Sequence, residues 1–241
     1  MTDEELAAHL AEEAGRLLIG QRRSSLLEHV ADGHVADKVA NAFILAGLAE
    51  WRPGDAVLSE ESPDDKERLG RSRVWIVDPL DGTREYAQGR DDWAVHVALA
   101  IDGAPRIGAV ALPAKGRLFR SDQARLSPPA ERDRPIMLVS RTRPPAEARE
   151  IAALLGADVV ALGSAGAKAM AVVAGEADLY YHAGGQHEWD NCAPAAIALA
   201  CGLHASRVGG APLVYNQADT LMPDILIARP ELAARVVAHC R

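Results

Sequence analysis

The 241-residue sequence predicts an α+β protein with two sheet-containing subdomains. In the first part of the chain, two amphipathic helical patterns precede a series of short apolar strands. In the last part, strand and helix patterns alternate. Between these parts, residues 121–135 contain three prolines, mixed charge and little periodicity, which is typical of a boundary. We therefore expect subdomains at residues 1–121 and 135–241.

The individual elements follow from hydrophobic spacing and turn residues. In the first part, we expect helices at residues 3–20 and about 35–50, and strands at 56–59, 74–78, 93–101 and 106–112. In the second part, we expect strands at 136–140, 158–161, 178–182, 203–206 and 224–228. Helices are expected there at 145–155, 165–174 and 190–200, with a last helix that starts at Pro230.

Composition and charge exclude several classes of protein. The net charge of −8 and the lack of a basic run argue against nucleic-acid binding. Residues 1–15 are acidic and rich in Ala and Leu, without the apolar core of a signal peptide or membrane span. The three cysteines form no regular framework, so free thiols and a cytoplasmic location are expected. Cys192 lies close to a candidate site, where a packing role is expected.

The segment VWIVDPLDGT at residues 74–83 places two carboxylates directly after a buried strand. Because Pro79 cannot donate to a sheet ladder, we expect the strand to end at Asp78. Gly82 permits a tight turn, after which a helix can begin. Carboxylates would repel a phosphate unless Mg²⁺ lies between them, and Mg²⁺ favours one or two carboxylates plus substrate phosphate. Alternatively, Asp78 and Asp81 cap only a turn and a helix.

Two further acidic positions favour the metal interpretation. Glu60 and Glu61 follow a short apolar run, although an acidic pair also suits a solvent-exposed surface. Asp190, in the sequence Glu188-Trp189-Asp190, precedes an Ala-rich helical stretch. The three acidic segments therefore have a fixed order along the chain: a strand followed by EE, a strand followed by DPLDGT, and WD opening a helix.

These three segments together resemble the lithium-sensitive, Mg²⁺-dependent phosphomonoesterases of the inositol monophosphatase superfamily. The DPLDGT segment is the most specific, and the similarity extends over almost the whole chain. Within the superfamily, the sequences GSAGAK at 163–168 and EWD at 188–190 are most similar to the 3'(2'),5'-bisphosphate nucleotidases of sulfate assimilation. The resemblance implies a layered αβαβα sandwich. Family members are often dimers, so a homodimer is an expected assembly, although no exposed apolar face is evident.

The resemblance also implies a set of metal ligands for two or three Mg²⁺ ions. Glu60 and the Leu80 carbonyl would bind the first ion, Asp81 and Asp190 the second, and Asp78 would bridge them. Such a pair of ions activates a water molecule and neutralises the leaving oxygen. His34 replaces a threonine that the family usually has, and the segment between the first two helices is short. Because of both differences, the presence of a third ion stays open. His34 could be a ligand of that ion or an exposed loop residue.

The resemblance further implies that two residues orient the attacking water and that backbone N–H groups hold the phosphate. The hydroxyl of Thr83 would act with Asp37, while the N–H groups of Gly82 and Thr83 would face phosphate oxygens. Thr83 could instead be a helix cap, and Asp37 a first-turn acid that stabilises the second helix.

Substrate recognition is expected in the second half of the chain. Lys168 interrupts a small, apolar helix start and would meet a second phosphate, or would extend to the surface as an amphipathic side chain. Ser164 and Gly166 permit close approach of a ligand, or form a turn. Arg143, with Arg141 near it, could reach the same phosphate. His182 lies where inositol phosphatases carry a sugar-binding glutamate, which argues against inositol.

We therefore expect a Mg²⁺-dependent phosphatase that removes the 3'-phosphate of 3'-phosphoadenosine 5'-phosphate, with the phosphosulfate as a further substrate. The alternative on the same scaffold is an inositol-1-phosphate or fructose-1,6-bisphosphate phosphatase. A phosphatase with a nucleophilic aspartate is disfavoured, because two residues separate Asp78 and Asp81 and a proline follows the first. A non-catalytic metal- or nucleotide-binding module is a third class, against which the full ligand set argues.

Overall fold

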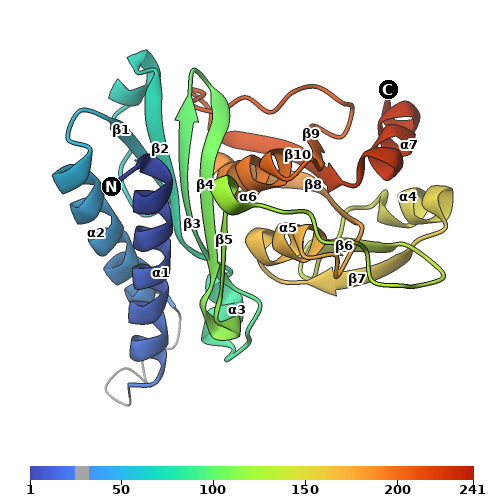
Figure 1. The fold of residues 1–241 in the computed structure, drawn as a ribbon, viewed down its shortest axis with the longest axis horizontal. Coiled ribbons are helices and arrows are strands. Elements are labelled where there is room, and N and C mark those ends of the chain that lie inside the picture. Colours follow the sequence, from blue (N-terminus) through green and yellow to red (C-terminus); the bar gives the residue numbers. More distant parts are fainter. Residues whose placement is uncertain (25–32) are drawn as a thin grey trace.

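Two five-stranded sheets and three layers of helices build the computed structural model, which describes residues 1–24 and 33–241 (Figure 1). Helices α1 (Asp3–Arg22) and α2 (His34–Trp51) cover the outer face of the first sheet. Helices α5 (Ala165–Val173) and α6 (Glu188–Ala200) lie between the sheets. Helices α4 (Ala148–Leu155) and α7 (Pro230–Cys240) cover the far face of the second sheet. The predicted αβαβα layering is confirmed.

The first sheet has the strand order β1-β2-β3-β4-β5. Its strands are β1 (Ala56–Ser59), β2 (Arg73–Asp81), β3 (Ala94–Ile101), β4 (Ala104–Leu112) and β5 (Arg117–Arg120). Strands β1 and β2 run parallel, and the other neighbours are antiparallel. The sequence did not predict β5, because an arginine at each end leaves only Leu118 and Phe119 as an apolar signal. Pairing with β4 stabilises this short edge strand.

Strand β2 does not end at Asp78 as predicted, but continues to Asp81. Asp78 pairs with His96 and Asp81 pairs with Ala94, so β2 has one extra residue between these pairs. This irregularity is a bulge, which accommodates a proline because a bulged residue leaves the ladder. Gly82 then adopts a positive φ of 91° before the short helix α3 (Thr83–Ala87). The bulge therefore sets where the two aspartates lie.

The second sheet has the strand order β7-β6-β8-β10-β9 and mixes parallel with antiparallel pairs. Its strands are β6 (Ile136–Ser140), β7 (Asp158–Leu162), β8 (Leu179–His187), β9 (His204–Ser206) and β10 (Leu221–Ala228). Strand β8 extends five residues beyond the predicted end at His182. It crosses Gly184 and Gly185, both at positive φ, and pairs on either side of them with β10, which starts three residues before its predicted start at Asp224. Two glycines hid this extension because they usually weaken a strand.

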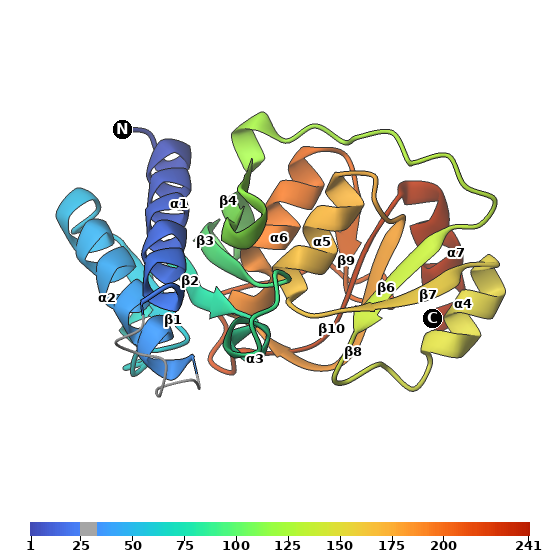
Figure 2. The ribbon, with the colours of Figure 1, turned by 90° about the horizontal axis from the view of Figure 1, so that it is seen from below.

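Helices α5 and α6 of the second half pack between the two sheets. Residues of β2, β3, β4, α5, α6 and β10 share one buried apolar cluster. The connection at residues 124–135 runs along the outside of the molecule from the first sheet to β6 (Figure 2). The division into subdomains at 1–121 and 135–241 stays a prediction. Among residues 1–24 and 33–241, no helix combines the length and apolar character needed to cross a bilayer.

Candidate metal centre and substrate cavity

Three carboxylates from two separate elements meet at one edge of the first sheet. Asp78, Asp81 and Asp190 each have an oxygen within 4.8 Å of the others. Asp78 and Asp81 lie on the bulged end of β2, and Asp190 lies in the first turn of α6. Glu60 follows β1 directly, and its N–H donates to the Val77 carbonyl at 3.2 Å. Since β1 and β2 run parallel, this places Glu60 beside Asp78 at the same edge.

The acidic cluster carries more negative charge than its surroundings compensate. Burial, together with the charges of Glu60 and Asp81, raises the pKa of Asp78 well above its usual value. Burial and the charge of Asp81 raise the pKa of Asp190 to about 6. Partial desolvation of its carboxylate, followed by the charge of Asp190, also raises the pKa of Glu60. A bound cation would relieve this repulsion, and carboxylate oxygens are the ligands that Mg²⁺ prefers. The donor set therefore fits a divalent metal.

Asp81 is the exception in this cluster, because several donors stabilise its charge. Its Oδ1 accepts from the Ala165 N–H at 3.2 Å and its Oδ2 from the Gly166 N–H at 2.7 Å. Burial alone would raise its pKa, but the positive charge of His96 and then of Lys168 lowers the pKa to about 2. The His96 Nδ1 lies 3.1 Å from the Trp189 carbonyl, which can only accept, so this nitrogen carries a proton.

The start of α6 is anchored on both sides of Asp190. Asp190 Oδ2 accepts from the His187 N–H at 2.6 Å, which caps the helix. The neighbouring Glu188 is fully buried, and its two oxygens accept from the N–H groups of Asn216 and Gln217, each at 2.7 Å. Glu188 therefore fixes the loop beside α6, whereas Asp190 faces Asp78 and Asp81.

Thr83 and Asp37 also come together, although they are 46 residues apart. The Thr83 hydroxyl lies 3.0 Å from the Leu80 carbonyl and 3.4 Å from Asp37 Oδ2. Gly82 occupies the N-cap of α3, so the alternative of Thr83 as a helix cap is wrong. Asp37 is 2% exposed, lies in the first turn of α2, and its Oδ1 has no hydrogen-bond partner within the described residues. Burial and the charge of Glu60 raise the pKa of Asp37 to about 8.

A cavity of about 590 Å³ opens next to the acidic cluster. It is lined by polar and charged residues from both halves of the chain. Those predicted from the sequence are Glu60, Asp81, Gly82, Thr83, Arg143, Ser164, Lys168 and Asp190. The acidic groups Glu60, Asp81 and Asp190 come from the segment after β1, from β2 and from α6, and are called the acidic end below. The basic groups Arg84, Arg143 and Lys168 come from α3, the segment after β6 and α5, and are called the basic end. Such an arrangement suits a ligand with two anionic groups, one of them bound through a cation.

Lys168 provides the buried positive charge of this cavity. It is 3% exposed, so the alternative of a surface lysine is wrong. Its ammonium group donates to the carbonyls of Gly163 and Ser164 and lies 5.1 Å from the centre of the Tyr180 ring. Burial lowers its pKa to about 8, against the opposing effect of Asp81. The lysine is therefore fixed in position before any ligand binds.

The other predicted substrate residues differ in how they are placed. Arg143 is exposed at the cavity wall, whereas Arg141 pairs with Glu85 at 2.6 Å and does not line the cavity. Ser164 caps α5 through the Ala167 N–H at 2.9 Å and lines the cavity as well. Gly166 lies outside the cavity lining and faces Asp81 and His96.

Several lining residues were missed by sequence reasoning, namely Arg84, Ser140, Thr142, Tyr180 and Gln186. They carry no motif, and their positions follow from the ends of β6 and β8 and from α3. In the sequence, His182 was notable only because inositol phosphatases carry a glutamate at this position. In the structure it is 2% exposed and also lines the cavity. Neither of its ring nitrogens has a hydrogen-bond partner within the described residues, and burial lowers its pKa to about 4. A polar residue in an apolar strand was the available signal for His182.

Other open expectations concern His34 and the cysteines. His34 Nδ1 lies 3.9 Å from Glu61 Oε2, at the start of α2. The short segment between the first two helices falls largely on residues 25–32, outside the described residues. All three cysteines are free thiols, as predicted, and burial raises the pKa of Cys192, which favours packing over reactivity.

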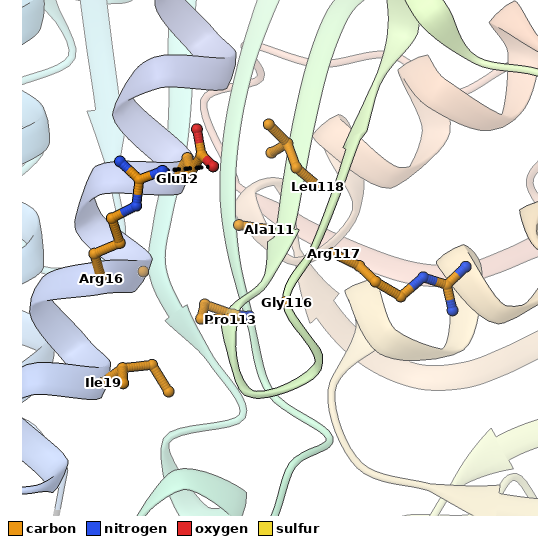
Figure 3. A pocket seen from close by; sticks show the side chains of 9 residues that line it. Glu12, Arg16, Ile19, Ala111, Pro113, Gly116, Arg117 and Leu118 are labelled. Carbon is orange, nitrogen blue, oxygen red and sulfur yellow. Dashed lines mark hydrogen bonds and ion pairs between the residues drawn. The ribbon is translucent and has the colours of Figure 1, made fainter.

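A second cavity of about 280 Å³ lies between α1 and the β4–β5 hairpin (Figure 3). Glu12 and Arg16 of α1 form an ion pair on its wall at 2.8 Å. Ile19, Ala111, Pro113 and Leu118 provide an apolar surface. The Arg117 side chain extends away from α1 and pairs with Glu176 at 2.5 Å. This cavity lacks the carboxylate cluster found at the first.

Comparisons with known proteins agree with this geometry. The family model described as the inositol monophosphatase family matches residues 3–241. The chain is 49% identical to a 3'-phosphoadenosine 5'-phosphate phosphatase of Mycobacterium leprae, over 97% of this chain and 91% of the relative. It is 32% identical to the 3'(2'),5'-bisphosphate nucleotidase CysQ of Escherichia coli K12, over 78% and 80% of the two chains. The crystal structure of CysQ from Bacteroides thetaiotaomicron matches with a TM-score of 0.80 and 27% identity, over 94% and 97%.

Proposed function

Because the chain belongs to the inositol monophosphatase family, we propose that it is a metal-dependent phosphatase that removes the 3'-phosphate of 3'-phosphoadenosine 5'-phosphate. The products are AMP and phosphate, and the corresponding phosphosulfate is a further candidate substrate. The single observation that carries the proposal is the cavity that joins a carboxylate cluster to a buried lysine. The relatives from Mycobacterium leprae and Escherichia coli support the choice of a nucleotide.

The two ends of the cavity suit the two phosphates of such a nucleotide. The reacting 3'-phosphate would bind at the acidic end through a cation. The 5'-phosphate would meet Lys168, whose ammonium group is already held by two carbonyls. A charge-assisted hydrogen bond to phosphate is about twice as strong as a neutral one. A substrate with one phosphate cannot use both ends, so the cavity favours bisphosphates.

We propose Mg²⁺ as the metal, with two or three ions. Glu60, Asp78, Asp81, Asp190 and the Leu80 carbonyl would hold them. When bound, the ions supply an activated water molecule and neutralise the oxygen that leaves. The chain adds Gly82 and Thr83, whose backbone N–H groups would orient the phosphate. No covalent intermediate is required.

Thr83 and Asp37 would orient the attacking water. The Thr83 hydroxyl can accept from the water only if its own proton points to another acceptor, and both Asp37 and the Leu80 carbonyl lie within 3.4 Å. Asp37 then fixes the direction in which the hydroxyl donates. This role is consistent with a buried carboxylate that has one oxygen near Thr83.

A phosphate-release assay with three substrates tests the proposal. 3'-Phosphoadenosine 5'-phosphate, inositol 1-phosphate and fructose 1,6-bisphosphate are compared at equal concentration, with Mg²⁺ or with EDTA. We expect the nucleotide to react fastest and EDTA to abolish the release of phosphate from all three. Equal rates on the three substrates would contradict the assigned substrate, and full activity in EDTA would contradict the metal.

The family further leads us to propose a homodimer and a cytoplasmic location. The molar mass in solution, measured by light scattering, tests the first proposal against the 25.6 kDa of the single chain. Fractionation of cells that express the protein tests the second.

A further inference from the structure

A fully buried histidine connects two elements of the metal centre. His96 lies within the otherwise apolar strand β3. Its Nε2 is 3.2 Å from Asp81 Oδ2, and its Nδ1 is 3.1 Å from the carbonyl of Trp189. Trp189 directly precedes Asp190 in the first turn of α6. One imidazole ring therefore contacts both a carboxylate of the cluster and the peptide group next to another.

The contacts of Asp81 show what the histidine adds. The N–H groups of Ala165 and Gly166 hold Asp81 from the side of α5. His96 contacts it from β3, on the oxygen that also accepts from Gly166. Two N–H donors from α5 and an ion-pair contact from β3 thus fix the orientation of the carboxylate. Without His96, the contact from β3 and the link to α6 would both be lost.

The neighbouring glycine is adapted to this histidine. A Cβ atom at residue 166 would lie 2.1 Å from His96 Nε2, far inside van der Waals contact. Only a glycine lets the start of α5 approach Asp81 while the imidazole stays in place. Gly166 was predicted to let a ligand approach or to form a turn, and the structure adds that it makes room for His96.

We infer that His96 is a positioning residue for the metal centre, because it holds Asp81 and the first turn of α6 so that carboxylates from both elements face the same cation. This inference rests on the proposed metal-dependent function and assigns a role to a residue outside the cavity wall. Residues that orient metal ligands in this way typically contribute about 10–100-fold to metal affinity.

Calorimetric titration of Mn²⁺ or Mg²⁺ into the metal-stripped protein tests the role without substrate. His96→Leu removes both polar contacts. His96→Gln keeps an N–H donor near the position of Nε2, and His96→Asn keeps one near the position of Nδ1. We expect a dissociation constant for the metal about 10–100-fold higher in the leucine variant. We expect partial recovery in the glutamine and asparagine variants.

Three controls separate positioning from general damage. His204, a half-buried histidine on β9, is changed to leucine, and we expect unchanged metal affinity. Gly166→Ala keeps His96 but forces the imidazole to move, so this variant should also weaken metal binding. If His96→Leu does not fold, the metal affinity of Gly166→Ala decides whether His96 positions the metal ligands. At saturating Mg²⁺, the KM for the nucleotide should change little in His96→Gln, while the Mg²⁺ concentration for half-maximal rate rises.

The outcomes distinguish this inference from the proposed function. Wild-type metal affinity in a folded His96→Leu or Gly166→Ala protein would overturn the positioning role and leave the proposed function intact. So would a change of substrate KM alone. Weakened metal binding in these variants, without hydrolysis of the nucleotide by the wild type, would instead overturn the proposed substrate and leave the role of His96 standing.

Discussion

The acidic and the basic groups that line the cavity differ in how their charges are held. At the acidic end, Asp78, Asp81 and Asp190 are buried or half-buried and receive hydrogen bonds from backbone N–H groups. At the basic end, Lys168 is buried and bonded to carbonyls, whereas Arg84 and Arg143 are exposed. The acidic end is thus fixed before a ligand arrives, and the basic end is fixed only in part. Catalysis should therefore tolerate changes at the acidic end least.

The largest effect is expected for Asp78→Asn. The substitution keeps the shape of the side chain but removes one negative charge from the centre of the cluster. Loss of a group that stabilises the transition state costs about 10²–10³ in kcat, and we expect at least the upper value here. Phosphate release at saturating Mg²⁺ measures it. A rate within about 10-fold of wild type would show that the acidic end is not the catalytic end.

Thr83→Val should lower the rate by about one order of magnitude less than Asp78→Asn does. Valine has the shape of threonine without the hydroxyl that lies near Asp37. Groups that position or accept protons typically contribute about 10²–10⁴-fold. We expect kcat to fall about 10²-fold, which is the lower end of that range, and we expect the metal affinity to stay unchanged. Equal kcat in Thr83→Val and wild type would contradict the assigned role, while Thr83→Ser should recover most of the rate.

Lys168→Met tests the basic end, because it removes the one buried cation among the basic groups of the cavity. We expect KM for the bisphosphate to rise about 10–100-fold, since a charge-assisted contact worth about 1.5–3 kcal/mol is lost. The KM for 3'-AMP, which has no second phosphate, should change by less than about 3-fold. Steady-state kinetics on both substrates provide the test. Parallel losses on both would place Lys168 outside the site of the second phosphate.

Arg143→Ala is the matched variant for an exposed cation at the same end. Because solvent screens an exposed charge, we expect a rise in the bisphosphate KM of only about 3-fold. A larger effect than that of Lys168→Met would reverse the order of importance that burial predicts.

The smallest effect concerns the stability of the metal-free protein. Asp37 has a pKa raised to about 8, and the pKa of Asp78 is also raised, so the native state binds more protons than the unfolded state between pH 6.5 and 8. Stability should therefore fall as pH rises through this window, by about 1.4 kcal/mol per pH unit for each excess proton. That corresponds to about 2–4 °C in Tm. Calorimetry in EDTA measures the slope.

Added Mg²⁺ and the variant Asp37→Asn test the cause of this dependence of stability on pH. Mg²⁺ should flatten it, because a cation replaces protons as the balancing charge. Asp37→Asn should flatten it in part, because one of the raised carboxyl groups is gone. A Tm that rises with pH in EDTA would contradict the repulsion that we assign to the acidic end.

The comparison also explains what the sequence could reveal. The acidic end was predictable because a strand followed by DPLDGT places Asp78 and Asp81 locally, and WD at a helix start places Asp190. The layers of the fold were predictable because strand and helix patterns alternate along the last part of the chain. His96 was not, because the Trp189 carbonyl that it contacts lies 93 residues later in the chain. Arg84 and Gln186 were not, because they belong to no motif. The predicted end of β2 was wrong because a bulge admits Pro79. The contact of Gly166 with His96 could not be predicted, because the histidine lies 70 residues earlier in the chain.

A crystal soaked with Mn²⁺ and 3'-phosphoadenosine 5'-phosphate tests the central claim most directly. We predict anomalous density for at least one ion among Asp78, Asp81 and Asp190, with the 3'-phosphate bound to it and the 5'-phosphate beside Lys168. Manganese bound elsewhere, or a nucleotide with neither phosphate at these two positions, would contradict the account.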